Sequence, residues 1–335
     1  MKVDNTVSDW KMVSKKAITS LTVVIVVIVI LGSLFIHSEL HPKSPSNGQN
    51  TQQQTPPPQV FRAILRVNGY TYEGYWTRDT ATDLPNFVSN VRYSISNIGN
   101  ADAINVSVTV YIDGKIYSSN ILPLLKFSDI YYSSFSVLTV YDSSSNVLIQ
   151  ASCQDSTDSY TLPVGSELPR YWTGDSDILK LYITPKEADV VKIKNQILGG
   201  FVLIHWIALK DWVANSITYK YDSNVHGVED YWQLPKETIE LRTGDCEDYA
   251  ILLCSLLRAD GWSPNDVYVV FGKNSEGKGH AWVKIKINLL LGSVWYNLEP
   301  QAGGWNIFDV VLDTWSCSGY QAECYFNDSQ FHTVG

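Results

Sequence analysis

The sequence lacks several patterns that would place it in common functional classes. It contains no cluster of Lys or Arg outside the N-terminus, and 25 basic against 34 acidic residues give a net charge of −9. Nucleic-acid-binding proteins normally carry a basic face, so we expect no nucleic-acid partner. There is no H-E-x-x-H motif and no cluster of Cys and His ligands, which argues against a metal-dependent hydrolase. No C-x-x-C pair is present, which argues against a zinc ribbon or a thioredoxin-type site.

The chain does contain enough apolar mass for two folded domains. Of its 335 residues, 45% are hydrophobic, including 11 Trp and 20 Tyr. Because domains usually contain about 100–200 residues, two of them are expected. The five cysteines are an odd number, so at least one thiol cannot form a disulfide within the monomer.

The N-terminus carries a candidate membrane anchor. Residues 17–36, AITSLTVVIVVIVILGSLFI, are uncharged and long enough to cross about 30 Å of hydrocarbon as a helix. A cleaved signal peptide usually has a shorter apolar core and a small-residue cleavage site, and no clear A-x-A follows here. Lysines in the tail 1–16 place this tail in the cytoplasm and the rest outside. Residues 37–59 are predicted to be a disordered Pro/Gln-rich linker. We therefore predict a single-pass cell-membrane protein with extracytoplasmic domains.

Residues 60–169 have the pattern of short β-strands. Runs such as FVSNVRYSISN, INVSVTVYIDG and IYYSSFSVLTVYD alternate apolar with polar residues, and turn signals such as Asp113-Gly114 separate them. Such strands at intervals of roughly 8–12 residues predict an all-β sandwich. The stretch YSISNIGNADAINVSVTVYIDGK resembles the immunoglobulin-like sandwiches of archaeal and bacterial surface proteins. We expect this domain to be a spacer or adhesion domain without catalytic residues.

Beyond residue 170 the pattern becomes helical and contains a candidate nucleophile. The sequence TPKE at 184–187 predicts a capping box, with helices over about residues 185–198 and 201–215. After Gly244, a helical stripe begins at Cys246 and ends near Gly261. Cys246 then lies at the helix N-terminus, where unpaired N–H groups and the helix dipole stabilise a thiolate and lower its pKa.

Two strand patterns downstream supply partners for this cysteine. In GKGHAWVKIKI, His280 lies on the polar face at the start of a strand. In VWYNLEPQAG, Asn297 and Glu299 share one face of another strand. A cysteine nucleophile needs a base, and that base needs a residue that holds its tautomer. His280 is therefore the candidate base, and either Glu299 or Asn297 is the candidate third residue.

The order GDCEDYA, GHAW and W-x-x-L-E-P resembles that of the transglutaminase-like superfamily, which has a Cys-His-Asp core on a papain-like fold. The upstream Y-W-x-x-P-x-E, at 231–237, is similar to the transglutaminase-like cysteine proteinases of bacteria. The resemblance covers about residues 205–305 and implies a papain-like α+β domain, which we assign to 170–335. It implies Cys246 as nucleophile and His280 as general base, with Glu299 where the family usually has Asp.

Two further features of the site are expected. The oxyanion hole would combine the backbone N–H of Cys246 with a side-chain donor, either Trp232 or Gln233. Three carboxylates crowd the nucleophile: Asp245, Glu247 and Asp248. Acids are favourable in a first helical turn, but calcium also prefers several carboxylate oxygens. In some transglutaminase-like proteinases, acids at these positions are linked to calcium. A calcium site is thus one interpretation, and no cofactor is otherwise expected to be required.

The remaining cysteines have other predicted roles. Cys254 lies on the apolar stripe of the predicted helix and should belong to the core. In an extracytoplasmic domain, Cys317 and Cys324 would close a small disulfide loop, the alternative being two free thiols.

Together these patterns predict an enzyme. The thiolate of Cys246 would attack an amide carbonyl of a surface protein or peptide, and His280 would protonate the leaving amine. Water as acceptor gives proteolysis or amide hydrolysis, and an amine gives transamidation. We favour hydrolysis because the motifs resemble the proteinases. The alternative is a non-catalytic transglutaminase-like surface module, although such a module has little reason to keep Cys, His and an acid at matching positions.

Overall fold

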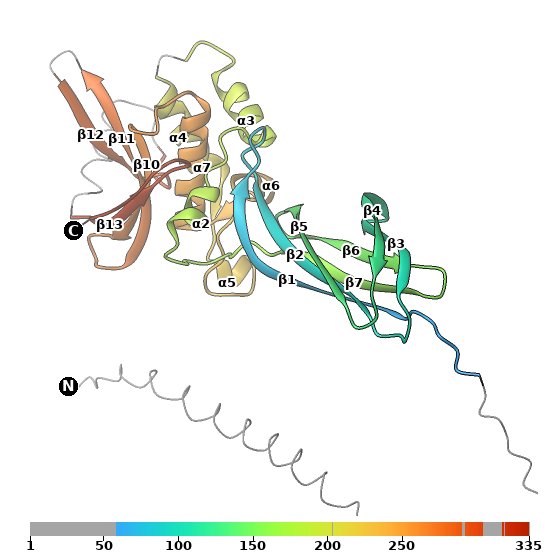
Figure 1. The fold of residues 1–335 in the computed structure, drawn as a ribbon. Coiled ribbons are helices and arrows are strands. Elements are labelled where there is room, and N and C mark those ends of the chain that lie inside the picture. Colours follow the sequence, from blue (N-terminus) through green and yellow to red (C-terminus); the bar gives the residue numbers. More distant parts are fainter. Residues whose placement is uncertain (1–57, 203, 290–291, 304–316, 318, 335) are drawn as a thin grey trace, which may run out of the picture. The chain divides into compact units, whose positions relative to one another are not determined.

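The structure is a computed structural model that describes residues 58–202, 204–289, 292–303, 317 and 319–334 (Figure 1). The predicted tail, the anchor 17–36 and all but the end of the linker lie outside these residues. Within the described ranges, no helix is long and apolar enough to cross a membrane. The anchor and the domain boundaries therefore stay predictions from the sequence.

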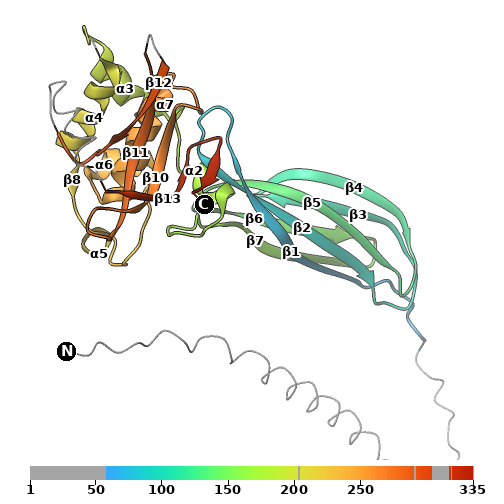
Figure 2. The same ribbon diagram turned by 90° about the vertical axis from the view of Figure 1, so that its left-hand side faces the viewer.

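The predicted β-sandwich consists of two antiparallel sheets (Figures 1 and 2). One sheet has the order β1–β2–β5, formed by Leu65–Arg78, Pro85–Asn97 and Ile130–Val140. The other has the order β4–β3–β6–β7, formed by Lys115–Leu125, Ala103–Ile112, Ser143–Ser152 and Thr157–Ser166. Alternating side chains of both sheets point inward and form a buried core that includes Val91, Ile95, Val106, Val147 and Ile149. This confirms the sandwich that the period-two pattern predicts.

The predicted turn between β3 and β4 is present. Asp113 and Gly114 have φ angles of 49° and 77°, and Ile112 pairs with Lys115 across the turn. Two central residues with positive φ form the turn type whose twist matches that of the flanking strands. An Asp-Gly pair adopts this geometry at little cost, which explains why the sequence signal was reliable.

The C-terminal domain packs helices against one face of an antiparallel sheet (Figure 1). The sheet order is β12–β11–β10–β13–β14, formed by Gly292–Leu298, Gly279–Leu289, Val267–Lys273, Gln321–Phe326 and Phe331–Thr333. The helices are α2 Ser176–Leu181, α3 Ala188–Leu198, α4 His205–Ser216, α5 Asp222–Val225, α6 Pro235–Leu241 and α7 Cys246–Ala259, and Thr218–Tyr219 (β8) pairs with Thr243–Gly244 (β9). Helix α7 is central, because it contacts α3, α4 and α6 as well as β10 and β11.

The predicted start of the helix after residue 184 is wrong by three residues. Helix α3 begins at Ala188, and its N-cap is Glu187, whose carboxylate accepts from the backbone N–H groups of Asp189 and Val190 at 2.9 and 3.1 Å. The backbone N–H of Thr184 instead donates to Ser255 Oγ on α7, at 3.2 Å. This tertiary hydrogen bond holds residue 184 outside the helix, and a side chain later in the sequence takes over the capping role.

Charged side chains connect the sandwich to the C-terminal domain. Arg78, at the end of β1, donates to the carbonyl oxygen of Ile183 at 2.6 Å. Arg170 donates to Asp142, in the turn after β5, and to both carboxylate oxygens of Glu237 on α6. It also donates to the carbonyl oxygen of Trp232. The sandwich is thereby tied to the segment that precedes α6, which contributes to the candidate site.

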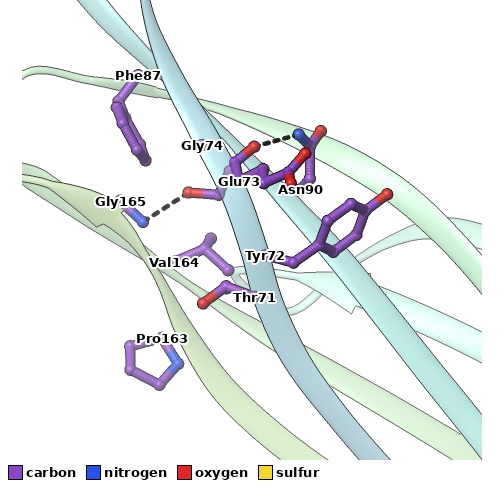
Figure 3. A pocket seen from close by; sticks show the side chains of 10 residues that line it. Thr71, Tyr72, Glu73, Gly74, Phe87, Asn90, Pro163, Val164 and Gly165 are labelled. Atoms are coloured by element: carbon purple, nitrogen blue, oxygen red, sulfur yellow. Dashed lines mark hydrogen bonds between the residues drawn. The ribbon is translucent and has the colours of Figure 1, made fainter.

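A hollow of about 240 Å³ lies on the sandwich beside β1 and β7 (Figure 3). A register shift of β1 between Tyr72 and Tyr75 produces it. Gly74 is required there, because a Cβ at this position would lie 2.2 Å from the ring of Phe87. The lining residues include one carboxylate, that of Glu73, and no cysteine or histidine. The hollow is therefore not the site that the sequence motifs predict.

Candidate active site

The candidate nucleophile begins the central helix. Cys246 is the first residue of α7, as predicted, and Asp245 precedes it as the N-cap. The backbone N–H of Asp245 donates to Asp248 Oδ2 at 3.2 Å, which fixes the first turn. Gly244 lies directly against this turn, since a Cβ on it would be 2.6 Å from Cβ of Asp248. The motif GDCED thus describes a tightly packed helix start with the thiol on its first residue.

The candidate base and one candidate third residue are in contact. His280 lies at the start of β11, and Glu299 directly follows β12, the neighbouring strand. His280 Nε2 and Glu299 Oε2 are 2.7 Å apart, and both side chains are nearly buried. The other candidate, Asn297, accepts a hydrogen bond from Trp282 Nε1 at 3.1 Å. Of the two candidate third residues, Glu299 is therefore the one that contacts the imidazole. Because this contact uses Nε2, Nδ1 is the other ring nitrogen that could accept a proton from a thiol.

The surroundings of the Cys246 thiol favour its protonated form in the absence of a bound cation. Its S–H donates to Glu247 Oε2 at 3.3 Å. Burial raises the pKa of Cys246, and the negative charges of Glu247 and Asp245 raise it further. The Ala281 backbone, in hydrogen-bonding contact with the thiol, acts in the opposite direction on this pKa. Burial and the two adjacent acids thus act against the predicted lowering of the thiol pKa by the helix N-terminus.

Tyr320 is a site residue that the sequence did not indicate. Its hydroxyl donates to Glu299 Oε2 at 3.1 Å, the same oxygen that His280 contacts. Its ring lies edge-on to the imidazole, with centroids 5.4 Å apart and planes at 90°, and also packs 5.1 Å from the ring of Trp282. Tyr320 therefore helps to hold the His280–Glu299 pair, although it follows Glu299 by 21 residues and belongs to no recognised motif.

The acids beside the nucleophile form part of a larger cluster. Asp222, in α5, and Asp230 join Asp245, Glu247 and Asp248. Two groups of three of these acids have ligand atoms within 4.8 Å of one another, and a third such group joins Asp245 and Glu247 to the Cys246 sulfur. Asp222 Oδ1 and Asp245 Oδ1 are buried without a hydrogen-bond partner. Burial raises the pKa of Asp222 to about 6 and raises the pKa values of Glu247 and Asp248 well above their usual range.

Such a cluster is better suited to bind a divalent cation than to bind water. Carboxylates this close repel one another, so adding positive charge favours their ionised forms. Hard oxygen ligands in this number are the donors that calcium prefers. The orphaned oxygens of Asp222 and Asp245 are available as ligands, which supports the calcium interpretation of the sequence.

The two candidate oxyanion donors differ in what surrounds them. Trp232 is a core residue, stacked on Phe271 at 4.9 Å and packed against Tyr182 at 5.2 Å. Gln233 is fully buried, and neither atom of its side-chain amide has a hydrogen-bond partner. Its backbone N–H donates to Asp248 Oδ1 at 2.8 Å, which ties it to the first turn of α7. Gln233 therefore has the unengaged amide donor that an oxyanion hole requires.

The predicted disulfide between Cys317 and Cys324 stays a prediction from the sequence. The carbonyl oxygen of Cys317 accepts from the backbone N–H of Tyr320 at 3.2 Å, and Cys324 lies on β13. Cys254 is fully buried in the core, as predicted.

Two family models match separate parts of the chain. The family described as bacterial transglutaminase-like cysteine proteinase matches residues 202–292, and the CARDB family matches residues 78–159. The UPF0252 protein MJ1282 of Methanocaldococcus jannaschii is 32% identical over 194 residues, or 53% of this chain and 52% of the relative. The chain thus spans about half the length of this curated relative.

Three solved structures show low similarity to parts of the chain. Calcium-bound LapG of Legionella pneumophila is 15% identical, with a TM-score of 0.32, over 48% of this chain and 81% of LapG. EGTA-treated LapG is 16% identical, with a TM-score of 0.34, over 48% and 78%. The CARDB domain of a Pyrococcus furiosus protein, in complex with di-metal ions, is 13% identical, with a TM-score of 0.26, over 32% and 97%.

The matched residues 202–292 include both Cys246 and His280, while Glu299 lies just beyond them. The motifs that indicated the resemblance in the sequence therefore coincide with the family match. The resemblance to the transglutaminase-like superfamily, and within it to the bacterial transglutaminase-like cysteine proteinases, is confirmed for this part of the chain.

Proposed function

We propose that this chain is a membrane-anchored, extracytoplasmic cysteine protease or amidase that cleaves amide bonds of surface proteins or peptides. Cys246 is the nucleophile, His280 the general base and acid, and Glu299 the residue that orients His280. The observation that carries the proposal is the 2.7 Å contact between His280 and Glu299, where His280 lies on β11, a strand in contact with the helix that begins with Cys246. Membrane anchoring and location rest on residues 17–36 and the basic tail before them.

The proposed reaction assigns each of these groups one role. His280 Nδ1 takes the proton of the Cys246 thiol, and the sulfur attacks the amide carbonyl carbon to form a tetrahedral oxyanion. The backbone N–H of Cys246 and the side-chain amide of Gln233 donate to that oxyanion. The C–N bond then breaks as His280 protonates the leaving amine, which leaves a thioester on Cys246. Water, deprotonated by His280, attacks the thioester and releases the acid and the thiol.

Calcium is proposed to bind the acid cluster of Asp222, Asp230, Asp245, Glu247 and Asp248. Two orphaned carboxylate oxygens within this cluster support it, and so do the structures of LapG, one calcium-bound and one EGTA-treated. A bound dication would supply positive charge next to the thiol. Glu247 and Asp245 would then no longer oppose the loss of its proton, because a cation neutralises their charge.

The test is the rate at which a small haloacetamide alkylates Cys246, measured against pH on the full-length chain in detergent. Mass spectrometry assigns the label among the five cysteines, and fully buried Cys254 serves as an internal control. The rate is measured with calcium and with a chelator, for the natural chain and for His280→Ala. We expect fast labelling in calcium well below about pH 8, where an ordinary thiol is slow, and loss of this labelling in His280→Ala.

The opposite result would leave the alternative function. If labelling follows an ordinary thiol profile in calcium and in chelator, and His280→Ala changes neither, Cys246 and His280 do not form a reactive pair. The domain would then be a non-catalytic surface module. If labelling depends on His280 but not on calcium, the catalytic proposal stands and the calcium proposal fails.

A further inference from the structure

Strand β5 is an unprotected edge of the sandwich. Within the described residues its ladder partner is β2 alone, and the register from Ser96–Ile130 to Asn86–Val140 is continuous, without a bulge. The strand reads IYYSSFSVLTV and contains no charged residue and no proline. Natural edge strands are normally blunted by charges, prolines or bulges, because their free N–H and C=O groups can pair with another chain. Strand β5 has no charged residue, no proline and no bulge.

The neighbouring edge of the other sheet, strand β4, differs from β5 in its residues. Strand β4 lies on the same side of the sandwich as β5, where the rings of Tyr117 and Phe135 are 5.3 Å apart (Figure 2). It also exposes apolar side chains, but it carries Lys115 and Pro123. A proline removes one backbone donor from an edge and limits its pairing. Of the two neighbouring edges, β5 is therefore the one that can accept a full-length partner strand.

The outward-facing side chains of β5 are large and apolar at both ends. Ile130 is 49% exposed, Tyr132 63%, Leu138 59% and Val140 53%. Ser134 and Ser136 lie between them on the same face. Exposed apolar clusters of this kind usually mark a surface that binds a partner.

The order of these side chains identifies the partner as a second copy of the strand. If two β5 strands pair antiparallel about a two-fold axis at Phe135, Ile130 faces Val140 of the other copy and Tyr132 faces Leu138. Ser134 then faces Ser136, so apolar side chains meet apolar ones and hydroxyls meet hydroxyls. Moving the axis to Ser134 would instead set Tyr132 opposite Ser136. The sequence of β5 is thus self-complementary in one register, as a two-fold interface requires.

We propose that β5 is the interface of a homodimer, in which two copies pair their β5 strands antiparallel about Phe135. Two three-stranded sheets then become one continuous sheet. The pairing satisfies the free backbone groups of both edges and covers the apolar side chains at each end of the strand. A single strand pair is small beside a standard interface of about 1,600 Å², so we expect a dimer that dissociates on dilution.

Sedimentation of the full-length chain in detergent, over about a hundredfold range of concentration, tests this proposal. Ser134→Lys and Ser136→Glu each place a charge opposite a serine of the other copy, and each should raise the dimer Kd by about tenfold. The double variant Ser134→Lys/Ser136→Glu sets each new ammonium opposite a new carboxylate and should restore the dimer. The control is Asn120→Lys, which puts the same charge on exposed β4 and should leave the Kd unchanged.

Each other outcome overturns the proposal. A natural chain that stays monomeric at every concentration has no such interface. A dimer that Ser134→Lys does not weaken, or that Asn120→Lys weakens equally, uses another surface. Weakening by both single variants without recovery in the double variant contradicts the Phe135 register. Recovery also shows that the single variants did not act through misfolding, since the double variant carries both substitutions.

Discussion

The role of Tyr320 gives a prediction that follows from two distances. Tyr320→Phe removes the hydroxyl that donates to Glu299 Oε2 at 3.1 Å, and keeps the ring that packs on His280. A hydrogen bond to a charged group contributes about 1.5–3 kcal/mol, and each 1.4 kcal/mol changes a rate about tenfold. Glu299 still accepts from His280 and from the backbone N–H of Gln301. We therefore expect the lower end of the range, a loss of about tenfold in the alkylation rate of Cys246.

The assay must separate an effect on positioning from a loss of folding. The alkylation rate is measured across pH, and with an amide substrate kcat should fall while KM changes little, because the hydroxyl acts on the base and not on substrate binding. The matched control is Tyr325→Phe, on strand β13, which begins directly after Tyr320; the ring of Tyr325 contacts Lys284. It should leave the rate unchanged. A Tyr320→Phe variant with the natural rate at every pH would refute the assignment.

Three further predictions concern the acid cluster, the C-terminal sheet and the junction of the two domains. Asp222→Asn removes a ligand with an orphaned oxygen and should weaken calcium binding about tenfold or more in calorimetric titration; equal affinity would exclude it as a ligand. Lys284 lies among three aromatic rings, and burial lowers its pKa to about 8 from 10.5. Between these values the unfolded chain binds more protons, so the free energy of unfolding should rise with pH across this window. Lys284→Met should abolish that slope in urea titrations and stabilise the protein at pH 7 by on the order of 1 kcal/mol, after allowance for the exposure of Lys284. Arg170→Met leaves Glu237 without its cation and should lower the free energy of unfolding by about 3 kcal/mol, whereas Lys180→Met, at an exposed ion pair, should change it by less than about 1 kcal/mol.

The parts of the site that the sequence predicted are those fixed by local structure. Cys246 follows a glycine and an N-capping acid and precedes an apolar helix, so its position at the helix start depends on neighbouring residues only. His280 and Glu299 lie at ends of strands whose alternation is visible in the sequence. The antiparallel pairing of these adjacent strands then brings the two side chains together. Local periodicity was sufficient in each case because the connecting segments are short.

The parts that the sequence did not predict depend on contacts between distant segments. Tyr320 precedes β13 and Glu299 follows β12, and these two strands are not neighbours in the sheet, so no strand pairing predicts their contact. Asp222 and Asp230 join the acid cluster because α5 contacts β9, the short strand that precedes α7. The early helix start near residue 184 was wrong for the same reason, since Ser255 on α7 holds Thr184 outside the helix. Short sequence motifs do not predict such contacts between distant segments.

The electrostatics of Cys246 show why the position of a cysteine alone does not establish its reactivity. A helix N-terminus stabilises an adjacent anion by about 0.3–1 kcal/mol, and by about 2 kcal/mol in favourable sites. A unit charge about 4 Å away contributes about 4 kcal/mol at an effective dielectric constant of 20. The carboxylate of Glu247 is 3.3 Å from the sulfur, so one ionised acid already outweighs the dipole, and Asp245 adds to it. The thiolate therefore forms only when these acids are protonated, when a cation neutralises them, or when the imidazolium of His280 outweighs them. Both acids belong to the candidate calcium cluster, and Asp245 has an oxygen without a hydrogen-bond partner, so on the calcium proposal the residues that suppress the nucleophile are those that would release it on binding the ion.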